Sequence, residues 1–109
     1  MDKLFTNKKH NVTGFSYYQD TVEASYNELV AVLGMPTKVY RKGKSPFDKV
    51  KYEWEIQIWA TGTFFTLYDW KESRYTAGQR IKWHIGALSN ESSEEAAQFV
   101  EGLLAENFE

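Results

Sequence analysis

The 109-residue chain contains no cysteine, two prolines and two histidines. The absence of cysteine excludes disulfides, thiolate metal sites and a cysteine nucleophile. No apolar run approaches the roughly 20 residues that cross a bilayer, and none follows the first three residues as in a signal peptide. There is no glycine-rich phosphate loop and no serine in a nucleophile elbow. The histidines and carboxylates lack the spacing of a metal site. We therefore expect a cytoplasmic protein that is not an enzyme, binds no cofactor or metal, and does not contact a membrane.

Aromatic residues, in contrast, are abundant. They make up 17% of the chain, and all four tryptophans lie between Tyr52 and Gly86. A chain of this size and composition is typical of one globular domain. We expect residues 1–12 to be a flexible lead-in and residues 13–109 to form a single α+β domain, with an extended segment over Val12 to Gln19.

Three segments between Lys51 and Gly86 alternate apolar and polar residues, which predicts strands. They are Lys51 to Ala60, Thr63 to Lys71 and Arg80 to Gly86. A two-residue turn at Thr61-Gly62 predicts a hairpin in which partner numbers sum to 123, so that Ile58 opposes Phe65. A second register, with partners summing to about 152, places Leu67 by Ile85 and Tyr68 by His84.

Two capping boxes predict helices. Ser25 and Glu28 begin a helix over Tyr26 to Leu33, which Gly34 and Pro36 end. Ser92 and Glu95 begin a second helix over Ser93 to Ala105. Val39-Tyr40 is expected to be an edge strand. The predicted fold is a two-layer α+β domain, with an antiparallel sheet of three to five strands and both helices packed on the face of Ile56, Leu67 and Ile85.

The opposite face of the predicted sheet carries more large aromatics than a solvated face needs. We predict a binding face there, formed by Trp59, Phe64, Tyr68, Trp70, His84 and Lys82. One interpretation is that residues 12–19 or a second subunit, in a homodimer, cover these rings. The other is a contact surface for a protein or ligand. A row of Glu55, Tyr68 and His84 is a further alternative, since these groups could perform acid–base chemistry.

Charge is divided along the chain. Residues 1–51 hold nine Lys/Arg and five Asp/Glu, a balance of +4, and residues 52–109 hold four and ten, a balance of −6. The basic half contains a candidate patch for an anionic partner, formed by Lys38, Arg41, Lys42, Lys44 and Lys49. The patch is either a solvated loop or a site for nucleic acid or an acidic protein surface. Nucleic-acid binding would use Trp59, Tyr68 and Trp70 as stacking surfaces.

Three stretches carry a resemblance. They are SYNELVAVLGMP (Ser25 to Pro36), YEWEIQIWATGTFFTLYDWK (Tyr52 to Lys71) and KWHIG (Lys82 to Gly86). In this order they resemble small proteins encoded by bacteriophages, prophages and plasmids. The group has no common activity, so the resemblance implies no catalytic residue. It implies an accessory protein of a mobile element that binds and modulates a host protein in the bacterial cytoplasm, such as a counter-defence, anti-CRISPR-like inhibitor.

Overall fold

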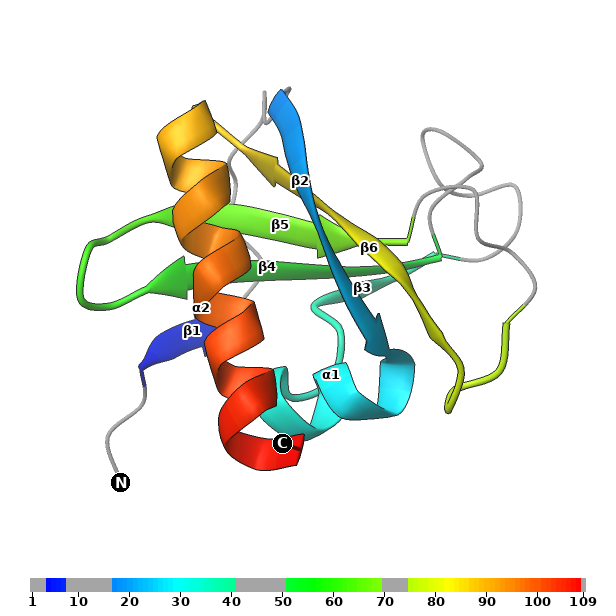
Figure 1. The fold of residues 1–109 in the computed structure, drawn as a ribbon. Helices are drawn as coiled ribbons and strands as arrows, with labels where there is room; N and C mark the ends of the chain where they lie inside the picture. Colours follow the sequence, from blue (N-terminus) through cyan, green and yellow to red (C-terminus); the bar gives the residue numbers. More distant parts are fainter. Residues whose placement is uncertain (1–3, 8–16, 41–50, 70–74, 109) are drawn as a thin grey trace.

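The fold is α+β, with a six-stranded antiparallel sheet and two helices (Figure 1). The computed structural model describes residues 4–7, 17–40, 51–69 and 75–108. In chain order its elements are β1 (Phe5–Asn7), β2 (Tyr17–Ser25), α1 (Tyr26–Leu33), β3 (Lys38–Val39), β4 (Tyr52–Ile58), β5 (Phe64–Tyr68), β6 (Arg80–Ala87) and α2 (Asn90–Phe108). The predicted α+β class and antiparallel sheet are confirmed.

The sheet has the strand order β1-β4-β5-β6-β2, and β3 also pairs with β4. The predicted three to five strands are too few because β1 and β3 both pair with β4, opposite residues 56–58 and 52–53 respectively. Strand β1 lies within the segment that was expected to be a lead-in. The expected edge strand at Val39-Tyr40 is found one residue earlier, as β3.

The core is one cluster of buried side chains from the strands and both helices. Buried side chains of both helices belong to the same cluster as those of the inner strands; the helical members include Leu29, Leu33, Val100 and Leu104. Trp54 and Trp83 are fully buried at its centre, with ring centroids 5.3 Å apart in an edge-to-face contact. Their indole N–H groups donate to the carbonyls of Gly34 (2.9 Å) and Ala24 (2.8 Å). Both buried donors are therefore satisfied, as a buried indole requires.

Helix α1 has the predicted bounds and the predicted capping box. Ser25 Oγ accepts from the Glu28 backbone N–H (3.0 Å), and Glu28 Oε1 accepts from the Ser25 N–H (2.8 Å). The helix ends at Leu33, and its C-cap Gly34 adopts φ +88° and donates its N–H to the Val30 carbonyl. This positive φ favours glycine.

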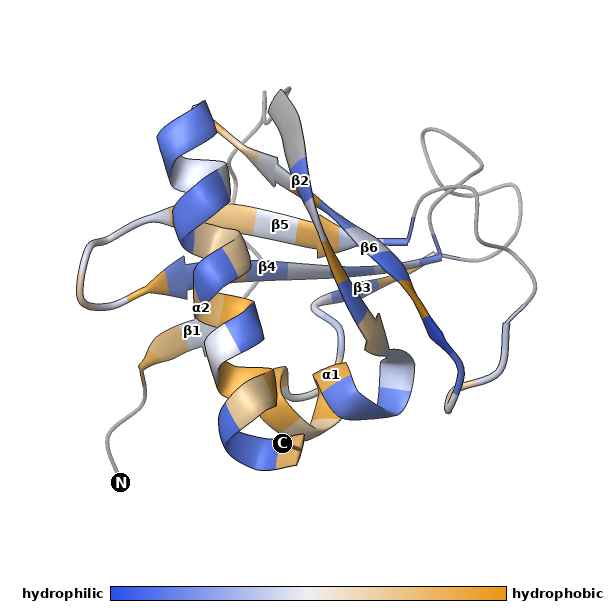
Figure 2. Cartoon of the chain, viewed as in Figure 1, coloured by the Kyte–Doolittle hydropathy of each residue, from blue (hydrophilic) through white to orange (hydrophobic). Residues whose placement is uncertain are grey.

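Helix α2 is longer than predicted at both ends, and its predicted capping box at Ser92 and Glu95 is wrong. Ser89 Oγ accepts from the Ser92 N–H (3.1 Å), one turn earlier than expected. Ser93, predicted as the first residue of the helix, lies within it and is buried. Its hydroxyl donates to the Asp20 carboxylate of β2 at 2.9 Å. Figure 2 shows hydrophilic residues recurring along α2 between the hydrophobic ones that pack on the core.

The β4–β5 register differs from the prediction by two residues. Ile56 opposes Phe65, so partner numbers sum to 121 rather than 123. The connection is a four-residue loop, since Ile58 N–H donates to the Thr63 carbonyl (2.8 Å) and Gly62 N–H to the Ile58 carbonyl (2.7 Å). Gly62 takes φ +73° in this loop. A shift of two leaves every side chain on its predicted face, because strand side chains alternate with period two.

The β5–β6 register agrees with the prediction, with Leu67 opposite Ile85 and Tyr68 opposite His84. Strand β2, however, spans Tyr17–Ser25 rather than residues 12–19, and residues 12–16 lie outside the described part of the chain. It pairs with β6 along its length, with a register shift between Tyr18 and Asp20. Val22 opposes Trp83 on the inner face, where both are buried.

Candidate functional site

The five described residues of the predicted six-residue binding face do not form one open surface. Trp59 lies in the β4–β5 loop and Lys82 on β6, and both are exposed; Phe64, Tyr68 and His84 are half-buried, and Trp70 lies outside the described residues. Between them Glu55 retains 6% of its accessible surface and Thr66 9%. The centre of this face is therefore covered.

Within the predicted row of Glu55, Tyr68 and His84, the pairing of Glu55 with Tyr68 is wrong because the β4–β5 register is shifted. Glu53, not Glu55, opposes Tyr68, and Glu55 opposes Thr66. Tyr68 and His84 do lie together, with ring centroids 6.0 Å apart and planes inclined by 26°. Strand β5 lies between the strands that carry Glu55 and His84.

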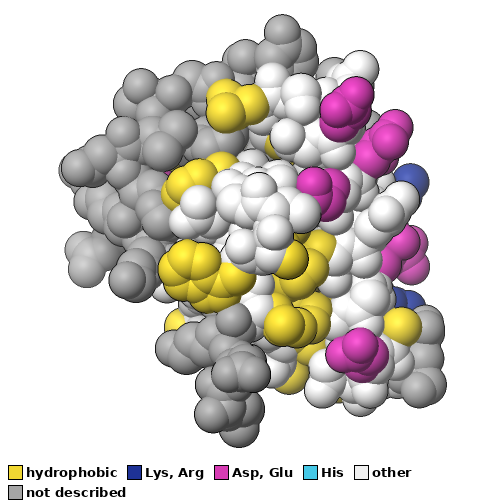
Figure 3. Space-filling model, turned by 90° about the vertical axis from the view of Figure 1, so that its left-hand side faces the viewer, with side chains coloured by type: hydrophobic (Ala, Val, Ile, Leu, Met, Phe, Trp, Pro, Cys, Tyr) yellow, Lys and Arg dark blue, Asp and Glu magenta, His cyan; other side chains and the backbone are white. Residues whose placement is uncertain are grey.

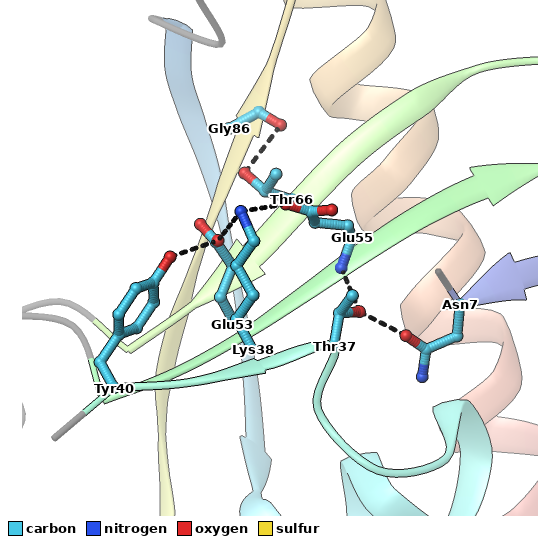
Figure 4. Close-up of polar contacts among 8 residues, drawn as sticks. All are labelled: Asn7, Thr37, Lys38, Tyr40, Glu53, Glu55, Thr66 and Gly86. Carbon is cyan, nitrogen blue, oxygen red and sulfur yellow. Dashed lines mark hydrogen bonds and ion pairs between the residues drawn. The ribbon is translucent and has the colours of Figure 1, made fainter. Parts of the chain in front are cut away.

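Lys38 from the predicted anionic-partner patch is held by carboxylates. Strand β3 sets it opposite Glu53, and its Nζ lies 2.7 Å from Glu55 Oε1 and 3.9 Å from Glu53 Oε1 (Figure 4). The other four members, Arg41, Lys42, Lys44 and Lys49, lie outside the described residues. The ammonium of Lys38 thus neutralises part of the negative charge of Glu53 and Glu55.

Tyr40 completes this polar cluster. Its hydroxyl donates to Glu53 Oε1 at 3.1 Å. Burial raises the pKa of the Glu53 carboxyl, while the Tyr40 hydrogen bond and the Lys38 charge act to lower it. Burial also raises the pKa of the Tyr40 phenol, as does the neighbouring Glu53 carboxylate. Each charged group has a partner within the cluster, so we assign the cluster a structural role.

A second polar network joins β1, α1, β3 and β4 through Asn7. Its Nδ2 donates to the carbonyls of Leu33 (2.9 Å) and Met35 (2.8 Å), and its Oδ1 accepts from the Thr37 hydroxyl. The Thr37 Oγ1 in turn accepts from the Glu55 N–H at 2.8 Å (Figure 4). Asn7 therefore fixes the short edge strand β1 against the end of α1.

Asp69 is fully buried where β4 begins and β5 has just ended. Its Oδ1 accepts from the N–H groups of Lys51 (2.8 Å) and Tyr52 (2.9 Å), and its Oδ2 accepts from the Tyr75 hydroxyl (2.7 Å). Burial raises the pKa of this carboxyl, and the three hydrogen bonds oppose that shift. Burial and the Asp69 contact raise the pKa of Tyr75. These bonds hold the residue 75 segment to the start of β4.

Exposed apolar side chains gather where β1 meets the β4–β5 loop. The backbone N–H of Trp59 donates to the Leu4 carbonyl at 2.9 Å. The exposed fraction is 57% for Trp59 and 56% for Leu4. The next residue, Phe5, makes an edge-to-face contact with Phe99 of α2, with centroids 5.8 Å apart. We call Leu4, Phe5, Trp59, Phe99 and Leu103 the Trp59 surface.

Figure 3 shows this side of the molecule, with hydrophobic side chains gathered over its middle. The sequence prediction included Trp59 but missed Leu4 and Phe5, which the chain brings here from residues more than 50 positions away. The signal that was available is the phenylalanine and leucine of Leu4-Phe5-Thr6, a short apolar segment within an otherwise polar, basic lead-in.

The described residues contain no group of three or more His, Cys, Asp or Glu side chains that could hold a metal ion. Within the same part of the chain, no helix is long and apolar enough to cross a membrane. Comparisons of the chain with protein-family models, curated proteins and solved structures gave no significant match.

Proposed function

We propose that the protein is a non-enzymatic binding protein that docks on another protein through the Trp59 surface. The proposal rests on the exposure of Trp59. Its side chain is more than half exposed, in a loop whose backbone is fixed by hydrogen bonds. Tryptophan is enriched among the few residues that supply most of the energy of an interface. Leu4, whose carbonyl accepts from the Trp59 backbone N–H, and the Phe5–Phe99 pair next along the chain would form an apolar rim that excludes water around Trp59 once a partner is bound.

The partner in this proposal is a host protein, and the protein acts as an accessory factor of a mobile element. The support is the resemblance of Ser25 to Pro36, Tyr52 to Lys71 and Lys82 to Gly86 to phage, prophage and plasmid proteins. Counter-defence by inhibition of a host enzyme is the activity that this origin favours. The site of action is then the bacterial cytoplasm.

Nucleic-acid binding is the less favoured alternative. Lys38 is engaged by Glu53 and Glu55, and Tyr68 already stacks on His84. Two carboxylates on this face repel phosphates, whereas backbone binding needs free positive charge. An arbitrary single-stranded oligonucleotide that binds at low salt, with a steep fall as salt rises, would support this alternative instead.

The test is affinity capture from host lysate with the tagged wild-type protein and with Trp59→Ala. We expect a stoichiometric protein partner with wild type and its loss with Trp59→Ala, because truncating a central tryptophan costs about 2 kcal/mol or more, roughly 30-fold in affinity.

The matched control is Val39→Ala, another exposed apolar residue. It lies beside Tyr52, at the opposite end of β4 from Trp59, about 20 Å away. Recovery of no partner by wild type, or equal recovery by Trp59→Ala and wild type with unchanged circular dichroism, would overturn the proposal.

A further inference from the structure

The charged side chains on the side of α2 that does not pack on the core are all acidic. The helix contains five glutamates and no lysine or arginine; they are Glu91, Glu94, Glu95, Glu101 and Glu106. All are exposed except Glu95, which is half-buried. The charge is thus concentrated on one element of a chain whose formal net charge is only −2.

These glutamates have no cationic partner in the described chain. The ion pairs there join Lys38 to Glu53 and Glu55, and Arg80 to Glu28 (3.2 Å), on other elements. Glu95 accepts a hydrogen bond from the neutral Thr61 hydroxyl. Among the described residues, the charge of α2 is therefore not compensated by a cation.

The helix itself does not account for all of this charge. A carboxylate near a helix N-terminus is favourable, which explains Glu91. Glu106 lies near the C-terminal end, where the dipole disfavours negative charge and where the last turn has no basic residue. Glu91 and Glu95 are also like charges four residues apart, a weakly destabilising spacing.

The acidic side chains fall into two rows on either side of the buried stripe. At about 100° per residue, Glu91, Glu95 and Glu106 lie within about 80° of Phe99, the residue that contacts Phe5. Glu94 and Glu101 share the opposite flank, more than about 120° from Phe99 on the same helical repeat. Only the first row borders the Trp59 surface.

The contact between Thr61 and Glu95 fixes this border, because it joins the loop that carries Trp59 to α2. Figure 3 shows acidic side chains beside the hydrophobic ones on this side, and the Lys and Arg side chains of the described residues only at the margin of the view. An apolar centre beside an acidic row calls for a partner of the opposite charge.

We infer that the partner of the Trp59 surface is a basic protein segment, in which lysine or arginine side chains flank an apolar one. The apolar side chain packs on Trp59 and Leu4, and the cations meet the row of Glu91, Glu95 and Glu106. This inference rests on the proposed protein-binding function and adds the chemistry of the partner. A nucleic acid is not the occupant, because phosphates are repelled by the same row.

The experiment uses two fluorescein-labelled amphipathic peptides that share one leucine-rich face and differ in the polar face, which is all lysine or all glutamate. Fluorescence anisotropy measures binding to wild type, Trp59→Ala, the double variant Glu91→Gln/Glu106→Gln and the matched double variant Glu94→Gln/Glu101→Gln. Both double variants remove two charges from α2, so they share any change in overall charge. Circular dichroism verifies that each retains its helix.

We expect the lysine peptide to bind wild type and the glutamate peptide not to bind. Glu91→Gln/Glu106→Gln should weaken binding about three- to tenfold, since each exposed pair contributes modestly, and Glu94→Gln/Glu101→Gln by less than about twofold. Equal losses in the two double variants would indicate general charge attraction and overturn the inference, as would absent binding of the lysine peptide.

The capture experiment separates this inference from the proposed function. A partner that Trp59→Ala loses but Glu91→Gln/Glu106→Gln retains at full affinity refutes the basic partner and leaves protein binding intact. A partner that wild type never captures removes the proposed function, whatever the peptides do.

Discussion

Replacement of Asp69 tests whether its buried carboxylate acts through hydrogen bonds or through charge. Asp69→Ala removes the acceptor of two backbone N–H groups, those of Lys51 and Tyr52, and the partner of the Tyr75 hydroxyl. A buried donor left unsatisfied costs about 1–3 kcal/mol. We expect Asp69→Ala to lower the free energy of unfolding by about 3–5 kcal/mol, a large part of the roughly 5–15 kcal/mol of a typical domain.

Asp69→Asn keeps a carbonyl oxygen for both N–H groups and lets the Tyr75 hydroxyl accept from the new amide. It also removes the cost of burying a charge. We therefore expect the free energy of unfolding at neutral pH to stay within about 1 kcal/mol of wild type. Urea unfolding of both variants, followed by tryptophan fluorescence, measures the difference.

The pH dependence of the free energy of unfolding independently tests whether burial disfavours the charged form of Asp69. Burial raises the pKa of Asp69 in the folded protein, so the folded state holds this proton more tightly than the unfolded state. Wild type should therefore lose stability relative to Asp69→Asn as pH rises from the usual carboxyl range through the raised pKa, and the difference should be constant above it. The other carboxylates titrate in both proteins and cancel. Equal destabilisation by Asn and Ala at neutral pH, or a difference of the opposite slope, would refute the reasoning.

Three further substitutions test the sheet and its loop by urea unfolding. Thr6 Oγ1 is buried with no partner among the described residues, so Thr6→Val should be neutral or stabilising by up to about 1 kcal/mol; a loss above that value contradicts it. Lys38→Met should cost about 1–3 kcal/mol at neutral pH by leaving Glu53 and Glu55 uncompensated, and less in acid as Glu53 takes up a proton; a loss that persists unchanged in acid would count against ion pairing. Gly62→Ala should cost about 1–2 kcal/mol through its positive φ alone, since a Cβ there meets no atom within 4 Å; an unchanged midpoint contradicts it.

The features that were predicted correctly depend on residues close together in the chain. Ser25 and Glu28 are three apart, and the capping box that they form sets the start of α1. Period-two alternation predicted β4, β5 and β6. The β5–β6 register followed because Leu67 and Ile85 must both face the core.

The errors arose where local chemistry allows two solutions. Gly62 accommodates a two-residue or a four-residue loop, and both leave the same residues on the inner face, so alternation does not distinguish them. The four-residue loop places Glu55 opposite Thr66 rather than opposite Tyr68. At α2, Ser89 and Ser92 are both suitable caps, and the contact of Ser93 with Asp20, 73 positions earlier, favours Ser89.

The candidate site could be predicted only in part, for the same reason. Trp59 was identified from its place in an alternating segment. Leu4 reaches it through the pairing of β1 with β4, and Lys38 reaches Glu55 through β3. The apolar Leu4-Phe5 segment is a local signal for a strand, but neither it nor the sequence around Lys38 indicates the partner strand, because the pairing of short edge strands depends on the assembled sheet.

The strand order has a consequence for the growing chain on the ribosome. The two strands made first, β1 and β2, lie at the outer positions, while the three made last form the central meander of β4, β5 and β6. Phe5 pairs with Ile58 and Val22 with Trp83, so neither can pair until these later residues have been synthesised. Strands β1 and β2 therefore emerge without their partner strands and stay unpaired with them until the meander has been synthesised. The growing chain exposes Val22 and Ala24 during that interval, which makes the N-terminal half the part that a ribosome-associated chaperone would contact first.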